Sequence, residues 1–308
     1  MEPVLSDVQR RRRRRGRISF RNKQVPIRLL LPNLVTLIGL CAGLTAIRMA
    51  IEGRYDVALG LIVLAALIDG IDGRIARMLK AQSRFGAELD SLADFVNFGV
   101  APAIVIFTWG LGGLRSFGWI VVMVFALACG LRLARFNAAL DEERPRWQSN
   151  YFTGMPAPAG AITVLLPLYL DGLGFIDIKA FPQLTVVSTL AMAFLMVSTI
   201  PTFSGKLAGE RIGRDYIPLV LVLAGLGVAF LLTYPYITMA ILTAAYLCLI
   251  PLSYQRFQWH LAQDAKQAPA DASAAAATVD NAELADKNGL SQPLAGAADD
   301  PLEDQTRH

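Results

Sequence analysis

The chain has 308 residues, of which 54% are hydrophobic, a positive mean hydropathy and a formal net charge of +4. A soluble α-helical protein needs polar stripes along its helices, and segments such as GWIVVMVFALACGL at 118–131 have none. The composition therefore excludes a soluble globular protein and predicts a multi-span membrane protein.

The first 27 residues are strongly basic and include the uninterrupted arginine run Arg10–Arg15. Such a run is compatible with nucleic-acid binding, but beside a membrane segment it favours contact with anionic lipid headgroups. We therefore expect membrane lipids as partners and no nucleic acid. The apolar run from Ile27 to Ala50 is too long for the core of a signal peptide, so we expect it to remain as the first span.

Eight stretches of the chain are apolar and long enough to cross roughly 30 Å of hydrocarbon. They are 31–52, 56–79, 90–111, 117–137, 157–174, 183–203, 216–233 and 235–254. The sequence thus predicts an all-α polytopic membrane bundle of about eight transmembrane helices. No strong internal repeat divides it, and we expect residues 28–255 to form one membrane domain.

The basic residues are unevenly distributed between the two sides of this predicted bundle. All but four of the 29 lysines and arginines fall on one side, the exceptions being Arg48, Arg54, Arg115 and Lys179. The positive-inside rule then places both termini and the active site on the cytoplasmic side of a multi-pass cell (inner) membrane protein. We expect residues 256–308 to form a cytoplasmic, largely disordered tail, because residues 264–308 are rich in Ala and Asp with Pro and Gly and cannot bury a core.

An acidic motif closes the second apolar stretch, where residues 69–94 read DGIDGRIARMLKAQSRFGAELDSLAD. At about 100° per residue, one arc of roughly 140° on a helix carries Asp69, Asp72, Gly73, Ala76 and Arg77. A second stripe at i, i+4 and i+8 carries Gly86, Asp90 and Asp94. A carboxylate at membrane depth costs about 2.5 to 3.5 kcal/mol, so four of them require a compensating cation or a function.

Carboxylates without Cys or His ligands suit hard divalent cations, Mg²⁺ or Mn²⁺, which commonly complete their shell with substrate phosphates. We expect two such ions and a phosphorylated substrate. Arg77 is able to hold a phosphate in a bidentate manner, and the small residues leave room for a base or diphosphate. Small residues also serve helix packing in membranes, which is the alternative for each of them taken singly.

Both histidines, His260 and His308, lie outside the apolar stretches. Their position disfavours a phosphohistidine intermediate and a Ser-His-Asp triad, so catalysis is expected to rest on carboxylates. The plausible reaction is displacement at phosphorus, in which the metals neutralise a diphosphate and a spare carboxylate takes the proton from the attacking hydroxyl.

The spacing D-x2-D-G-x2-A-R-x8-G-x3-D-x3-D is matched in full and resembles the signature of the CDP-alcohol phosphotransferases. The resemblance implies a membrane enzyme, commonly a homodimer, that transfers part of a CDP-linked lipid or alcohol to a second alcohol and releases CMP. It implies metal ligation by Asp69, Asp72 and Asp90, with Asp94 contributing to the metal site and acting as general base. It further implies a nucleotide and phosphate pocket shaped by Gly73, Ala76, Arg77 and Gly86.

Outside the motif, the segments at 31–44, 130–137 and 150–161 are similar to the phosphatidylserine synthase branch of this family. That resemblance implies CDP-diacylglycerol and L-serine as substrates, with phosphatidylserine and CMP as products. Asn33 and Thr36 would then face the nucleotide, although Pro32 and Asn33 are also typical of a helix start.

A serine carboxylate requires an arginine or a cluster of N–H donors. The candidates for acceptor binding are Arg132, Arg135, Asn137 and Asn150. Arginines at a cytoplasmic helix end also commonly reach toward the headgroups, which leaves a topological role open.

Rival functions remain at this stage. The same chemistry would serve another acceptor, namely glycerol 3-phosphate, an inositol phosphate, or serine on an archaeal-type lipid. Membrane prenyltransferases also place aspartate pairs around Mg²⁺, and a divalent-cation channel or transporter lines its pore with acids. Dependence on a cytidine donor, or ion flux without CMP release, separates these classes.

Overall fold

The computed structural model describes residues 27–79, 83–139, 151–174, 177–203 and 216–287. The chain divides into two compact units, with the boundary after Ile250, and the core and the candidate site belong to the first unit. The arginine run and Asn150 lie outside the described residues.

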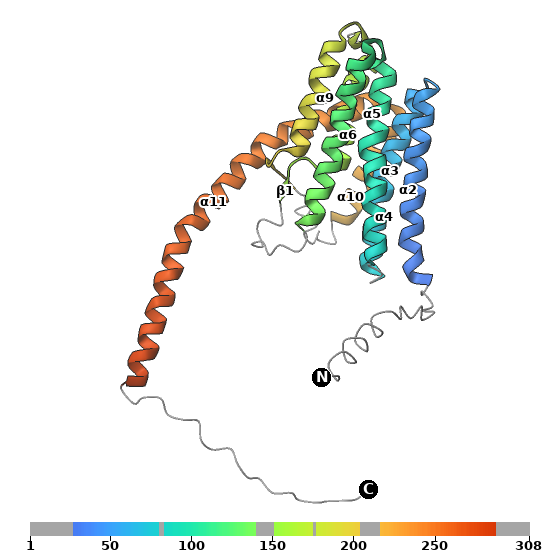
Figure 1. Ribbon diagram of the computed structural model, residues 1–308. Coiled ribbons are helices and arrows are strands. Elements are labelled where there is room, and N and C mark those ends of the chain that lie inside the picture. Colours follow the sequence, from blue (N-terminus) through green and yellow to red (C-terminus); the bar gives the residue numbers. More distant parts are fainter. Residues whose placement is uncertain (1–26, 80–82, 140–150, 175–176, 204–215, 288–308) are drawn as a thin grey trace, which may run out of the picture. The chain divides into compact units, whose positions relative to one another are not determined.

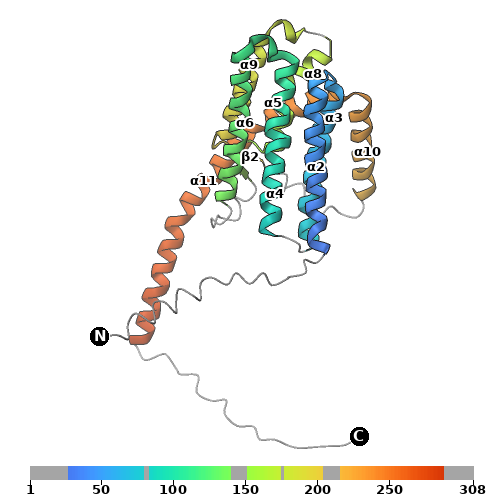
Figure 2. The ribbon, with the colours of Figure 1, turned by 45° about the vertical axis from the view of Figure 1, so that its right-hand side comes forward.

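The first half of the fold is a series of long helices that stand side by side (Figures 1 and 2). Its elements are α2 (Ile27–Ile51), α3 (Tyr55–Met78), α4 (Arg84–Asp94), the π-helix η1 (Phe95–Val100), α5 (Ala101–Ile106), the π-helix η2 (Phe107–Leu111), the 3-10 helix η3 (Gly112–Leu114) and α6 (Arg115–Ala138). The elements from α4 to η2 follow one another as a single rod (Figure 1), and η3 reverses the chain into α6.

The second half contains shorter helices and one small pair of strands. Its elements are β1 (Tyr151–Thr153), α7 (Ala157–Val164), α8 (Leu166–Gly172), the 3-10 helix η5 (Ile178–Ala180), α9 (Pro182–Val197), β2 (Pro201–Phe203), α10 (Ile217–Thr233) and α11 (Pro235–Lys287). The strands β1 and β2 pair antiparallel, with Phe152 opposite Thr202. The all-α class is therefore confirmed, apart from this short pair that the sequence analysis did not anticipate.

Each of the eight predicted apolar stretches is helical over most of its length. Among the described residues, three helical runs combine the length and the apolar composition needed to cross a membrane: Leu30–Ile51, Arg84–Ala138 and Pro235–Trp259. Shorter apolar helices occupy Ala157–Gly172, Pro182–Val197 and Ile217–Thr233. These helices support a membrane protein, and the number of crossings stays a prediction.

Small residues allow α2 to approach its neighbours closely. A Cβ atom added to Gly39 would lie 3.2 Å from the side chain of Ile68 on α3, and one added to Gly43 would overlap the side chain of Asn97 on η1. Ala46 on α2 and Ala58 on α3 are fully buried. Close backbone approach of this kind is the usual way in which membrane helices pack without a hydrophobic driving force.

The C-terminal ends of α6 and α9 meet at the strand pair. The Arg135 guanidinium donates to the carbonyl oxygens of Val197 at 2.7 Å and Ser198 at 3.0 Å, which lie at the C-terminal end of α9. The Thr202 hydroxyl donates to the Gly154 carbonyl at 2.8 Å, and Gly154 has a φ of +78°, a left-handed conformation that favours glycine. Orphan carbonyls at this helix end are thereby satisfied by a charged donor.

The helix α11 continues to Lys287 and so includes residues 264–287, for which the composition predicts no packed structure. Its C-terminal part is rich in alanine, which has the highest helix propensity of all residues. Composition that is too polar to bury a core therefore does not prevent a helix. The predicted domain limits at residues 28 and 255 remain predictions.

Candidate active site

Two helices contribute the four aspartates of the acidic motif. Asp69 and Asp72 lie near the C-terminal end of α3, and Asp90 and Asp94 lie on α4. Ser83 caps the new helix by accepting a hydrogen bond from the Gly86 N–H at 3.0 Å. Helical spacing groups the acids of each helix on one face. In the structure the acidic faces of α3 and α4 lie opposite one another.

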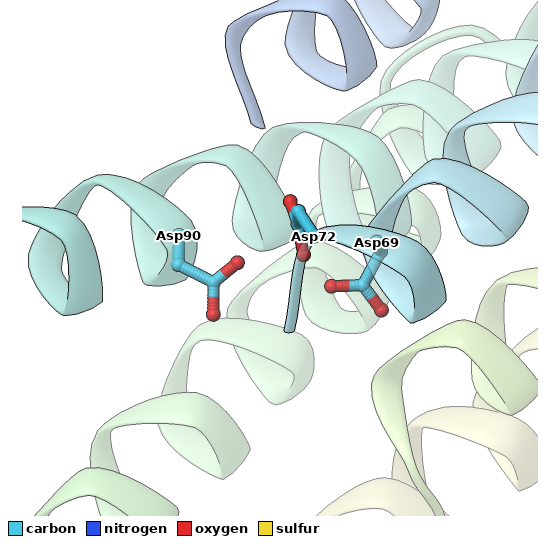
Figure 3. Close-up of side chains that lie close together, drawn as sticks. All are labelled: Asp69, Asp72 and Asp90. Carbon is cyan, nitrogen blue, oxygen red and sulfur yellow. The ribbon is translucent and has the colours of Figure 1, made fainter. Parts of the chain in front are cut away.

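Three of the four carboxyl groups converge. Asp69, Asp72 and Asp90 each offer one oxygen atom such that these atoms all lie within 4.8 Å of one another. Figure 3 shows the carboxyl groups of Asp69 and Asp90 directed toward each other from two helices, with Asp72 between them in this view. Like charges this close repel one another, and a cation between them would offset the repulsion. The oxygen-only donor set therefore fits a hard divalent cation such as Mg²⁺ or Mn²⁺.

Asp72 is the most deeply buried of these acids, with 4% of its surface exposed. The Thr36 hydroxyl on α2 lies 2.9 Å from the Asp72 Oδ2 atom and also 3.1 Å from the Pro32 carbonyl oxygen. Thr36 is itself buried. The hydroxyl therefore fixes the orientation of one carboxylate of the cluster from a neighbouring helix, as supporting residues commonly do at sites that bind metal.

Asp94 occupies a separate position beside Asp69. Their side chains come within hydrogen-bonding reach of each other, and the Arg132 guanidinium on α6 interacts electrostatically with both. Close packing explains how α6 reaches this point. A Cβ atom on Gly99 would lie 3.1 Å from Cys129, and one on Gly130 would lie 3.2 Å from the Phe95 ring. The absence of side chains at these two glycines brings α6 against η1 and places Arg132 next to Asp94.

The acids line a pocket to which α2, α3, α4 and η1 all contribute residues. It is lined by Thr36, Gly39, Ala65, Ile68, Asp69, Asp72, Asp90, Ala93, Asp94 and Asn97. Sequence reasoning missed Asn97, which is 2% exposed and whose Oδ1 atom has no hydrogen-bond partner among the described residues. Its position three residues after Asp94 and seven after Asp90 was the signal that could have found it.

The other residues that are expected around the nucleotide differ in their exposure and in their neighbours. A Cβ atom on Gly86 would lie 2.8 Å from the Asn33 side-chain oxygen, so the structure brings these two predicted residues together. Gly73 and Arg77 are exposed, and a Cβ atom on Gly73 would meet nothing within 4 Å. Ala76 lies between them on α3.

The candidates for acceptor binding are separated by the structure. Arg132 faces the acids, and its Nε atom is buried without a hydrogen-bond partner among the described residues. Arg135 is instead engaged with the carbonyls at the end of α9. The Asn137 amide donates to the Ser91 hydroxyl at 2.8 Å and is exposed.

The sequence matches known protein families over the segments that form the fold and the acidic site. Residues 29–203, which include α2 to α9 and the whole acidic motif, match the family described as CDP-alcohol phosphatidyltransferase. The chain belongs to this family. The membership confirms the resemblance expected from the motif, and CDP-alcohol phosphatidyltransferases are transferases. Residues 215–251, which include α10 and the start of α11, match a second description, CDP-alcohol phosphatidyltransferase 2.

Similar members of the family carry names that refer to serine. The CDP-diacylglycerol–serine O-phosphatidyltransferase of Mycobacterium tuberculosis is 41% identical over 234 residues, which cover 75% of this chain and 80% of that protein. The protein of the same name from Mycobacterium leprae is 40% identical over 234 residues, covering 75% and 76%. The archaetidylserine synthase of Methanothermobacter thermautotrophicus is 33% identical over 184 residues, covering 58% and 72%.

Proposed function

We propose that the protein transfers the phosphatidyl group of CDP-diacylglycerol to the hydroxyl of L-serine, giving phosphatidylserine and CMP. The observation that carries the proposal is the convergence of Asp69, Asp72 and Asp90 within 4.8 Å in a chain whose relatives are named for this reaction. Three carboxylates at one point suit a diphosphate bound through divalent cations. The relatives then supply the identity of the acceptor.

In this proposal Asp69, Asp72 and Asp90 hold two divalent cations, Mg²⁺ or Mn²⁺, to which Asp94 also contributes. The bound cations would neutralise the diphosphate and the departing CMP. The Thr36 hydroxyl keeps Asp72 in its ligating orientation. Asn33, Gly73, Ala76, Arg77 and Gly86 surround the nucleotide and its phosphates, where Arg77 pairs with a phosphate and the small residues leave room for the base.

Asp94 is the general base of the proposed reaction. It accepts the proton of the serine hydroxyl, and the oxygen forms a bond to the phosphorus that carries diacylglycerol while the bond to CMP breaks. Arg132 lies beside Asp94 and is the acceptor-binding residue best placed for serine. Arg135, Asn137 and Asn150 complete the acceptor set, with Arg135 acting through its hold on the end of α9.

We also propose eight membrane crossings with both termini and the active site on the cytoplasmic side of the cell (inner) membrane, and assembly as a homodimer. The uneven distribution of basic residues supports this orientation. A site at the cytoplasmic edge allows a soluble amino acid to reach a lipid whose acyl chains stay in the bilayer.

The test is CMP release from CDP-diacylglycerol by the purified full chain in detergent with Mn²⁺ or Mg²⁺. Serine, glycerol 3-phosphate and an inositol phosphate are offered in parallel, and a donor with archaeal-type chains is included because one relative is named archaetidylserine synthase. Release that requires serine and yields phosphatidylserine supports the proposal. Release with another acceptor retains the site chemistry and overturns the choice of serine.

A further inference from the structure

A polar cluster lies next to the candidate site, where Arg132 adjoins Asp94. It consists of Arg132 on α6, Tyr246 on α11 and Thr202 on β2. Arg132 interacts electrostatically with Asp94 and also with Tyr246, so it joins the carboxylate site to α11. The Arg132 Nε atom and the Tyr246 hydroxyl are buried, and neither has a hydrogen-bond partner of good geometry among the described residues.

The surroundings of Tyr246 leave its hydroxyl available for a ligand. Thr202, which is 2% exposed, interacts with the Tyr246 hydroxyl, but the single hydroxyl hydrogen of Thr202 is donated to the Gly154 carbonyl, so Thr202 offers Tyr246 no donor. Thr243, three residues earlier on the same face of α11, is 1% exposed, and its hydroxyl likewise lacks a partner in the described part of the chain. Buried hydroxyl and guanidinium groups are normally hydrogen-bonded, so unpaired examples in one cluster require an explanation.

A guanidinium and a phenol that share one space are suited to an anion, and a planar carboxylate is the typical partner of arginine. Because this cluster lies next to Asp94, the chemical structure of the bound anion is restricted further. A small molecule with its carboxylate at Arg132 and Tyr246 and its hydroxyl on the second carbon from the carboxylate would direct that hydroxyl toward Asp94. Serine carries both groups on one short chain, whereas an uncharged alcohol would leave these donors unpaired.

The location of Tyr246 in the sequence agrees with a role in acceptor choice. The general family match ends at residue 203, and Tyr246 falls within residues 215–251, which match the second description. The clustered acids lie within the general match. Tyr246 therefore lies outside the segment that carries the proposed metal site, which is compatible with a role in acceptor binding rather than in metal binding.

We propose that Tyr246 is a specificity-determining residue that, together with Arg132, binds the carboxylate of an amino-acid acceptor. This inference rests on the proposed function and adds the group that distinguishes serine from an uncharged alcohol. Arg135 stabilises the C-terminal end of α9, after which the chain continues into β2 and Thr202, one member of the cluster.

The experiment compares the wild-type chain with Tyr246→Phe in the CMP-release assay, using serine and serinamide as acceptors. Serinamide replaces the carboxylate by a neutral amide. Because Tyr246→Phe retains the ring, packing is preserved, and an unchanged KM for CDP-diacylglycerol verifies the fold. The control is Tyr254→Phe, an exposed tyrosine on the same helix.

A lost hydrogen bond to a carboxylate predicts that Tyr246→Phe raises the KM for serine about tenfold or more. It also predicts that the ratio of kcat/KM for serine over serinamide falls by a similar factor, while Tyr254→Phe changes neither. An unchanged KM and unchanged ratio, or a drop in kcat alone, overturns the role of Tyr246. If the wild-type chain makes no phospholipid from serine, the proposed function itself fails before any variant is compared.

Discussion

The hydroxyl of Thr36 offers a direct test of the carboxylate site, since it donates to Asp72, one of the three clustered acids. The perturbation is Thr36→Val, which keeps the shape of the side chain and removes the donor to Asp72. Both residues are buried, at 7% and 4% exposure, so water is poorly placed to replace the lost contact.

A hydrogen bond to a charged group contributes about 1.5 to 3 kcal/mol. The Thr36 hydroxyl divides its single hydrogen between Asp72 and the Pro32 carbonyl, so the lower end of this range applies. About 1.4 kcal/mol corresponds to a tenfold change in an equilibrium constant. We therefore expect the Mn²⁺ concentration for half-maximal activity to rise roughly tenfold, within the range found for supporting residues at metal sites.

The assay is CMP release at saturating CDP-diacylglycerol and serine as a function of Mn²⁺ concentration. Thr45→Val on the same helix is the matched control, because the exposed Thr45 hydroxyl contacts only the Cys41 backbone carbonyl among its described hydrogen bonds. An unaltered half-activation concentration in folded Thr36→Val protein would show that this hydroxyl does not orient a metal ligand and would refute the reasoning.

Three further perturbations test other parts of the site and fold. Asp94→Asn should retain Mn²⁺-dependent CDP-diacylglycerol binding while turnover falls by about 10²-fold or more; near-normal turnover would remove Asp94 as general base. Asp90→Asn should weaken metal binding as well, measured by Mn²⁺ titration, and an unchanged metal dependence would count against its ligand role. Gly43→Ala should lower the unfolding temperature in detergent through a cost of about 1 to 3 kcal/mol, because the new methyl group overlaps Asn97. Gly60→Ala, where a Cβ atom meets nothing within 4 Å, is its control, and equal unfolding temperatures for the two variants would contradict the predicted close approach.

The acidic motif was predictable because its residues lie close together in the sequence, at spacings that correspond to turns of a helix. Helical periodicity determines which residues share a face, so the spacing placed Asp69 and Asp72 on one helix face and Asp90 on a second one, while the resemblance to the family implied that the three act together. The family followed from the same motif. Asn97 carried the same periodic signal, but an amide lacks the charge that drew attention to the acids.

The contacts that the sequence did not reveal join residues far apart along the chain. The Arg135 guanidinium donates to carbonyls 62 and 63 residues later, a contact that no local pattern encodes. Tyr246 reaches Arg132 only because of how α11 packs within the first unit. The number of crossings is equally hard to read, since α9 and α10 are apolar but short for a bilayer.

The π-helix η1 begins at the residue after Asp94 and separates the α-helical segments α4 and α5 of the rod. A π-turn contains one more residue than an α-turn, and such bulges often occur at functional sites. The direction in which the acids of α4 point is therefore separate from the direction in which the apolar residues of α5 point. The acids of α4 face the proposed metal site, and the apolar residues of α5 pack in the core. Removing one residue from η1 would rotate one half against the other by about 100°. The π-helix η1 therefore sets the angle between the face that carries the acids and the face of α5 that packs in the core.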